Sequence, residues 1–165
     1  MVALGPRERV AGMNVIETLF PNLQLSNYQI TSPETEIYNC VAWAAGATNK
    51  WWWPIGDPLL TYWPAGSPKQ ETVPAFQVMF ANLGFVPCDS AEVEMGFEKL
   101  AIFADAGQTP MHVARQLPGG TWTSKLGRLE DIEHTLADLE GTEYGIVVLV
   151  MRRAAGGAST QAQTS

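Results

Sequence analysis

The sequence predicts an α+β domain in which a short N-terminal helix bearing a cysteine packs on an antiparallel β-sheet. Small apolar residues at positions 40–48 follow a helix-capping Asn39, and an amphipathic pattern covers positions 72–83. The second half instead holds apolar or alternating segments of strand length, separated by glycine-containing turns. Helical patterns followed by a run of strands are typical of the α+β class.

The chain of 165 residues is long enough for one domain with a hydrophobic core. We predict a flexible N-terminal arm at residues 1–18, one folded domain at residues 19–153, and a disordered Gly/Ala/Ser/Thr/Gln-rich tail at residues 154–165. The net charge of −7 argues against nucleic acid or an anionic membrane as a partner. An unidentified protein partner stays possible.

The N-terminus lacks the apolar segment of a signal peptide, and no apolar run reaches the length of a membrane span. We therefore expect a cytoplasmic protein, although export without a signal peptide stays open. The two cysteines have no CxxC spacing and the histidines lie in unrelated segments, so we expect neither a metal site nor a cofactor.

The individual elements follow from local patterns. Polar residues and prolines predict loops at 22–36 and 51–68, and the second of these is rich in Trp and Tyr. Thr72 can cap the helix predicted at 72–83, and Gly84 can end it. The remaining predictions are strands at 85–88, 97–105, 111–117, 121–126 and 144–151, and a helix at 130–139.

Cys40 is the candidate nucleophile. It directly follows the predicted cap Asn39, so its sulfur would lie in the first turn of a helix. Backbone N–H groups and the helix dipole favour an anion at that position, which predicts a lowered thiol pKa. Cys88 follows a short apolar segment without a nearby base or helix start, which predicts a packed or idle thiol.

His112 is the candidate base. It opens a predicted strand, and its face also carries Ala114 and Gln116, which leave room for a cleft. Cysteine catalysis further needs a group that orients the base. Ser124 on the returning strand is one possibility and Asp131 another, because a register slip of one residue would change which side chain faces His112.

Other residues could complete such a site. The backbone N–H of Cys40 and a side-chain amide could form an oxyanion hole, with Asn39 and Gln29 as the nearest amides. Trp52, Trp53 and Trp63 either cap the core or line a substrate cleft. His134 lies among acidic residues of the helix predicted at 130–139, where a solvated side chain is expected.

The order of a helix-borne cysteine, a strand-borne histidine and a polar residue on the next strand resembles papain-like cysteine peptidases and amidases, including the NlpC/P60 and CHAP amidases. The sequence is more similar to an uncharacterised bacterial papain-like domain family with the motifs found here at residues 38–44, 51–54 and 112–127. The resemblance covers about residues 19–153. Asn39 stands where many NlpC/P60 members have Asp.

This resemblance implies a papain-like core and a cysteine hydrolase, amidase or acyl transferase using Cys40, His112 and a third residue such as Ser124. The substrate would be a peptide-like or other amide compound. The alternative is a catalytically inactive domain of the same kind that binds a ligand or partner.

Overall fold

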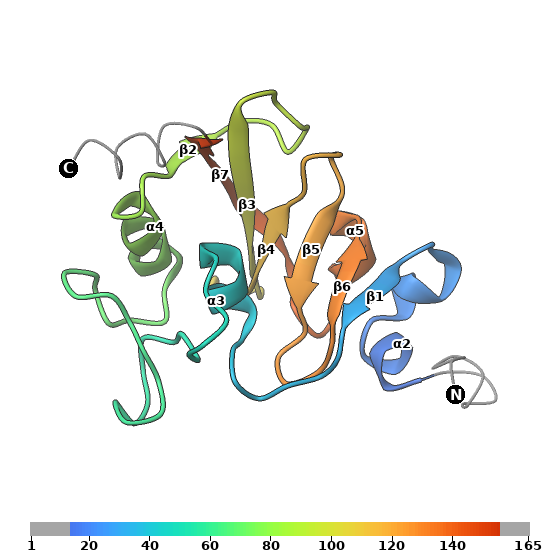
Figure 1. Ribbon diagram of the computed structural model, residues 1–165, viewed down its shortest axis with the longest axis horizontal. Helices are drawn as coiled ribbons and strands as arrows, with labels where there is room; N and C mark the ends of the chain where they lie inside the picture. Colours follow the sequence, from blue (N-terminus) through green and yellow to red (C-terminus); the bar gives the residue numbers. More distant parts are fainter. Residues whose placement is uncertain (1–13, 156–165) are drawn as a thin grey trace.

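The computed structural model describes residues 14–155 and is organised around one seven-stranded antiparallel sheet (Figure 1). The strand order is β1-β6-β5-β4-β3-β7-β2. The strands are β1 (Gln29–Ser32), β2 (Val86–Cys88), β3 (Phe97–Ala104), β4 (Pro110–Gln116), β5 (Trp122–Lys125), β6 (Asp131–His134) and β7 (Ile146–Ala154). The helices are α2 (Val15–Leu19), α3 (Cys40–Ala45), α4 (Val73–Ala81), α5 (Leu136–Leu139) and the 3₁₀ helix η1 (Pro21–Leu25).

The sheet has a hydrophobic cluster on each face, because successive strand residues point to opposite sides. On one face, α3 and α4 pack on a set that includes Leu100 and Val113. On the other, α2, η1 and α5 pack on a set that includes Phe103 and Ala114. Figure 1 shows α3 and α4 on one side of the strands and α2 and α5 on the other.

The predicted papain-like core is wrong. The structure is mostly antiparallel sheet, and the longest helix among the described residues, α4, has only nine residues. The broad α+β class fits loosely, since short helices do cover both faces. Isolated helices of this length are marginal, so the sheet, with its two apolar faces, supplies the framework to which the helices dock.

Two predicted elements have a different structure. The helix predicted at 130–139 is instead strand β6 followed by the four-residue α5, and the predicted loop at 22–36 contains strand β1. Strand β6 pairs with both β1 and β5, so sheet pairing overrides the helical pattern of its apolar residues. The predicted helix at 72–83 is confirmed as α4, with Thr72 accepting from the Ala75 N–H at 3.2 Å.

The chain ends bear on the predicted domain limits. Asn14 caps α2 by accepting from the Glu17 N–H at 2.8 Å, and the buried Ile16 packs in the hydrophobic cluster on one face of the sheet. The rest of the predicted arm, residues 1–13, and the tail from residue 156 lie outside the described residues. Within residues 14–155, no helix is long and apolar enough to cross a lipid bilayer.

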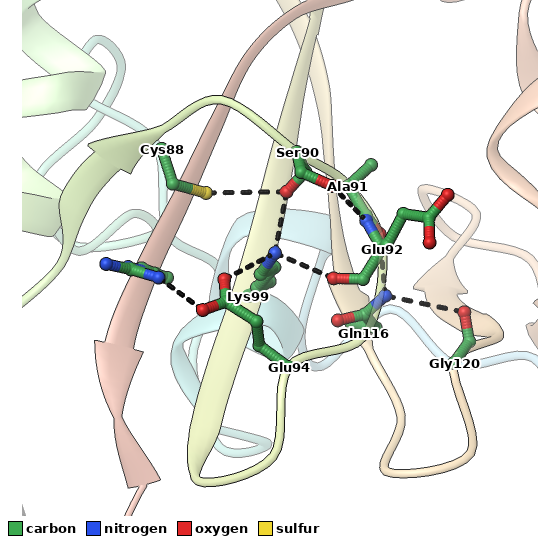
Figure 2. Close-up of polar contacts among 9 residues, drawn as sticks. Cys88, Ser90, Ala91, Glu92, Glu94, Lys99, Gln116 and Gly120 are labelled. Carbon is green, nitrogen blue, oxygen red and sulfur yellow. Dashed lines mark hydrogen bonds and ion pairs between the residues drawn. The ribbon is translucent and has the colours of Figure 1, made fainter.

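A buried lysine fixes the loop between β2 and β3. The Lys99 ammonium donates to the carbonyl oxygens of Ser90 and Glu92, each at 2.7 Å, and lies 3.0 Å from a Glu94 carboxylate oxygen (Figure 2). The second Glu94 oxygen accepts from Arg152 on β7. Because the Lys99 side chain is fully buried, these partners replace the water that the ammonium would otherwise bind.

Candidate functional site

Cys40 begins α3, as the sequence predicts. The Asn39 side-chain oxygen accepts from the Ala42 N–H at 3.3 Å, and Gly46 ends the helix in the left-handed region with a φ of 88°. The six residues of α3 pack against β4 and β5. Because Cys40 is the first of these residues, its sulfur lies near both the sheet and the N-terminus of the helix.

The thiol of Cys40 is not poised as an anion, contrary to the lowered pKa expected at a helix start. Cys40 is only 6% exposed, and burial raises the pKa of its thiol to about 11. The N–H groups of Val113 and Val41, and the charge of Lys125, favour the thiolate but do not offset desolvation. Cys40 therefore rests as a neutral thiol at neutral pH.

His112 lies on β4, and its ring is enclosed by aromatic side chains. Tyr144 stacks on it with ring centroids 4.1 Å apart, and Phe103 meets it edge-on at 5.3 Å. His112 has no exposed surface, and this burial holds its pKa well below the ordinary value. The imidazole is therefore neutral at neutral pH, as a proton acceptor must be.

Ser124 contacts His112, whereas Asp131 does not supply this contact. The Ser124 hydroxyl lies 2.8 Å from His112 Nε2 and 2.7 Å from His134 Nε2, so it joins the two imidazoles. The Asp131 carboxylate instead accepts from Tyr38 at 2.7 Å and from Ser32. Of the two candidates for the third residue, the structure brings only Ser124 to the histidine.

His112 keeps one nitrogen free. Its Nδ1 atom is buried and has no hydrogen-bond partner among the described residues. A buried polar atom without a partner is uncommon in a folded protein and costs stability. Such an atom is therefore a candidate for a functional contact.

Cys40 and His112 lie toward opposite faces of the sheet, beside the first residues of β4. The His112 ring contacts Phe103 of the α2/α5 face, whereas Cys40 clusters with Val113 on the α3 face. The pairing of β4 with β5 is limited to Arg115 with Thr123 and Gln116 with Trp122. The two strands do not pair farther toward His112, so the Val113 N–H is available to donate to the Cys40 sulfur. The thiol thus lies against the peptide that joins His112 to Val113.

Neither predicted oxyanion amide is available to Cys40. The Asn39 Nδ2 donates to the Trp52 carbonyl at 2.7 Å, and its oxygen accepts from the Trp52 N–H at 2.9 Å. Gln29 is exposed on the edge strand β1, where it pairs with Glu133, and β6 and β5 separate it from β4. Asn39 therefore anchors the aromatic loop, and Gln29 lies away from Cys40.

The three tryptophans have different surroundings. Trp53 donates to Glu71 at 2.6 Å and Trp63 to the Pro68 carbonyl at 2.9 Å, and both rings pack on Phe76. These two cover the core. Trp52 packs against the cluster that contains Cys40, and its indole Nε1 is buried without a partner among the described residues. Of these three tryptophans, only Trp52 has an indole N–H without a partner among the described residues.

Lys125 and Cys88 have structural surroundings. The fully buried Lys125 ammonium donates to the carbonyl oxygens of Thr35 and Gly127, which ties the loop before Cys40 to a turn after β5. The sulfur of Cys88 lies 3.6 Å from the Ser90 carbonyl oxygen. No three His, Cys, Asp or Glu side chains between residues 14 and 155 group closely enough to hold a metal ion.

A family model described as a domain of unknown function, DUF7689, matches residues 29–152, which is 124 of the 165 residues. The chain belongs to this family. The expected membership of an uncharacterised domain family is confirmed, but nothing in the match supports similarity to papain-like or NlpC/P60 proteins. No curated protein and no solved structure matches the chain. The DUF7689 domain spans all of the site residues described above.

Sequence reasoning missed His134 and Tyr144. His134 was expected to be a solvated helix residue but is buried on β6. Ile132 and His134 lie two residues apart between acidic residues, and this period-2 pattern was a usable signal for a strand. Tyr144 precedes Gly145, which has a φ of 78° and leaves no space for a Cβ beside the Ala104 carbonyl. That close approach brings Tyr144 onto His112.

Proposed function

We propose that Cys40, His112 and Ser124 form a thiol site that hydrolyses or transfers an acyl group from an amide or related bond. The observation that carries this proposal is the pair of nitrogens on His112. Nε2 is held by Ser124, while Nδ1 is buried without a partner in the same stretch of β4 that contacts the Cys40 thiol. A base held at one nitrogen and free at the other suits proton transfer from a thiol.

The reaction would begin from neutral groups. His112 Nδ1 takes the proton of Cys40 as the sulfur attacks the acyl carbon, and the resulting imidazolium gives that proton to the leaving amine. The carbon–nitrogen bond breaks and a thioester remains on Cys40. Water then attacks the thioester carbon and gives one proton to His112. The carbon–sulfur bond breaks, the acid product keeps the water oxygen and its other proton, and His112 returns its proton to the sulfur, which restores the thiol.

Trp52 is the best supported donor for the developing oxyanion. Its indole N–H is buried and unpaired, and Asn39 fixes its backbone beside the first turn of α3. The backbone N–H of Cys40 is the second candidate donor. Donors held in advance in a site shielded from water stabilise the charge that develops on a carbonyl oxygen.

A chemically inactive binding domain is the second candidate. The observation that favours it is the burial of Cys40, whose thiol is protonated at neutral pH. In such a domain Cys40 would be only a core residue, and His112 would not assist acyl transfer to it.

The test uses an activated acyl ester, p-nitrophenyl acetate, on the full chain carrying Cys88→Ser, so that Cys40 is the sole thiol. We expect a burst of nitrophenolate and an acetyl adduct on Cys40 by mass spectrometry. His112→Asn should slow acetylation about 100-fold, and Trp52→Phe, which keeps an aromatic ring, should slow it about tenfold or more.

The Cys40→Ser variant of the same protein is the matched control and should give no adduct. Circular dichroism of each variant checks that it folds. Folded protein that gives no adduct, or that is acetylated equally fast with His112 and with Asn at this position, would favour the binding domain.

A further inference from the structure

The hydrogen bonds around His134 define the position of its proton. His134 Nδ1 lies 2.6 Å from the carbonyl oxygen of Thr135, which can only accept. Nδ1 must therefore carry the hydrogen. Burial lowers the pKa of His134 to about 4, with Asp138 and Glu133 acting in the opposite direction. The ring is neutral at pH 7, and its Nε2 holds a lone pair.

The position of the His134 proton determines how the Ser124 hydroxyl is oriented. The hydroxyl has one hydrogen, and the lone pair of His134 Nε2 at 2.7 Å accepts it. The serine oxygen can then only accept from the other side, where His112 Nε2 lies at 2.8 Å. His112 Nε2 must therefore carry the hydrogen of its neutral ring.

The protonation state of the remaining nitrogen of His112, Nδ1, follows directly. A neutral imidazole has one N–H and one lone pair, so Nδ1 holds the lone pair. This is the atom that is buried without a partner. With the opposite tautomer an N–H would stand unpaired there, and His112 could not accept a proton at that position.

We infer that His134 is a positioning residue that acts through Ser124 to hold His112 in the tautomer with an unprotonated Nδ1. Its role in acyl transfer rests on the proposed function, but the two tautomers do not. His134 has no hydrogen bond to Cys40 or to His112 Nδ1 among the described residues, so its hydrogen-bonded link to His112 runs through the serine hydroxyl.

The direct test is nitrogen NMR of the full chain with ¹⁵N-labelled histidine at pH 7. Long-range proton–nitrogen correlations distinguish the two neutral tautomers, and with two histidines in the chain a His112→Gln sample assigns the signals. We expect the Nε2–H form for His112 and the Nδ1–H form for His134. An Nδ1–H form of His112, or a protonated His134, would overturn the inference.

Two substitutions of His134 extend the test. Glutamine places an amide oxygen near the position of Nε2 and can still accept from Ser124, whereas leucine cannot. His134→Gln should therefore keep the Nε2–H form of His112, and His134→Leu should release the serine hydrogen toward His112 and populate the Nδ1–H form. Retention of pure Nε2–H in a folded His134→Leu protein would contradict the relay.

The acetylation assay separates this inference from the proposed function. His134→Leu should slow acetylation of Cys40 about tenfold or more through loss of the base, and His134→Gln should restore most of the rate. If no variant is acetylated but the tautomers are as expected, the proposed function fails and the relay stands. If acetylation occurs with the opposite tautomers, only the relay fails.

Discussion

Two buried polar clusters in this protein differ in how completely they are satisfied. Around Lys99, the ammonium has two carbonyl oxygens and a carboxylate, and that carboxylate is shared with Arg152 (Figure 2). Around His112, three side chains are joined through one hydroxyl, yet a buried nitrogen has no partner. The Lys99 cluster closes on itself, and the His112 cluster leaves one lone pair open.

This difference separates a structural cluster from a candidate site. Buried groups that are fully paired hold a loop in place, as Lys99 holds the chain between β2 and β3. A buried atom without a partner lowers stability and adds nothing to the packing. The open nitrogen of His112 therefore has a physical explanation if a proton or a ligand is to occupy that position.

Acid should destabilise the histidine cluster first, and this is the largest expected effect. The folded-state pKa of His134 is about 4 against an ordinary 6.5, so the unfolded chain binds more protons as the pH falls between these values. The shift corresponds to about 3 kcal/mol of unfolding free energy lost by pH 4. His112, whose pKa is also lowered, adds to the loss.

Urea unfolding at pH 6.5, 5.5 and 4.5 measures this loss. The Lys99 cluster serves as the internal reference, because its ion pairs lower the pKa of Glu94 below the ordinary 4.5. The stability that the Glu94 ion pairs contribute is lost only as the pH falls through about 4.5 and below. Stability that stays constant from pH 6.5 to 4.5 would contradict the assignment of both buried histidines as neutral.

Replacing Lys99 tests the closed cluster. Lys99→Met keeps much of the side-chain volume but leaves the Ser90 and Glu92 carbonyl oxygens without the ammonium. We expect a loss of about 2–3 kcal/mol in unfolding free energy. Lys50→Met is the matched control, since Lys50 is exposed and should change stability by less than about 1 kcal/mol. Equal effects would mean that burial of Lys99 contributes nothing.

Sequence patterns predicted the local elements around Cys40 better than its environment. Asn39 and Gly46 bound α3 as expected, because capping depends on neighbouring residues alone. The raised thiol pKa depends on burial by segments distant in sequence, so the helix start indicated the wrong direction. The predicted helix at 130–139 failed for the same reason, since pairing with β1 and β5 makes it a strand.

The candidate site was predictable in part. Cys40 and His112 were chosen by elimination among two cysteines and two histidines, and Ser124 by its place on the returning strand. The second contact of Ser124, to His134, depends on the register of β5 with β6, which the sequence does not specify. The role expected of Asn39 assumed a free amide, which its bonds to Trp52 exclude, and the role expected of Gln29 assumed a position near Cys40, which depends on the strand order.

Removing the Asn39 side chain should have an intermediate effect. Asn39→Ala deletes the cap of α3 and both bonds to Trp52, and we expect a loss of about 1–2 kcal/mol. Asn39→Asp keeps the oxygen that caps the helix but cannot donate to the Trp52 carbonyl. Thermal or urea unfolding should therefore place the Asp variant between the Ala variant and the original protein. Equal stability of all three would show that the cap is unimportant.

The smallest effect is expected for Gln29, and a second glutamine provides the comparison. Gln29→Ala should change unfolding free energy by less than about 0.5 kcal/mol, because its amide is exposed and its bond to the Asn27 carbonyl is long, at 3.4 Å. Gln116→Ala should cost about 1 kcal/mol or more, because this buried amide donates to the Ala91 carbonyl at 2.8 Å. Acetylation of Cys40 should be unchanged by Gln29→Ala. A slowed reaction in that variant would return Gln29 to the site, against its position on the edge strand, and would show that the sheet rearranges when Cys40 reacts.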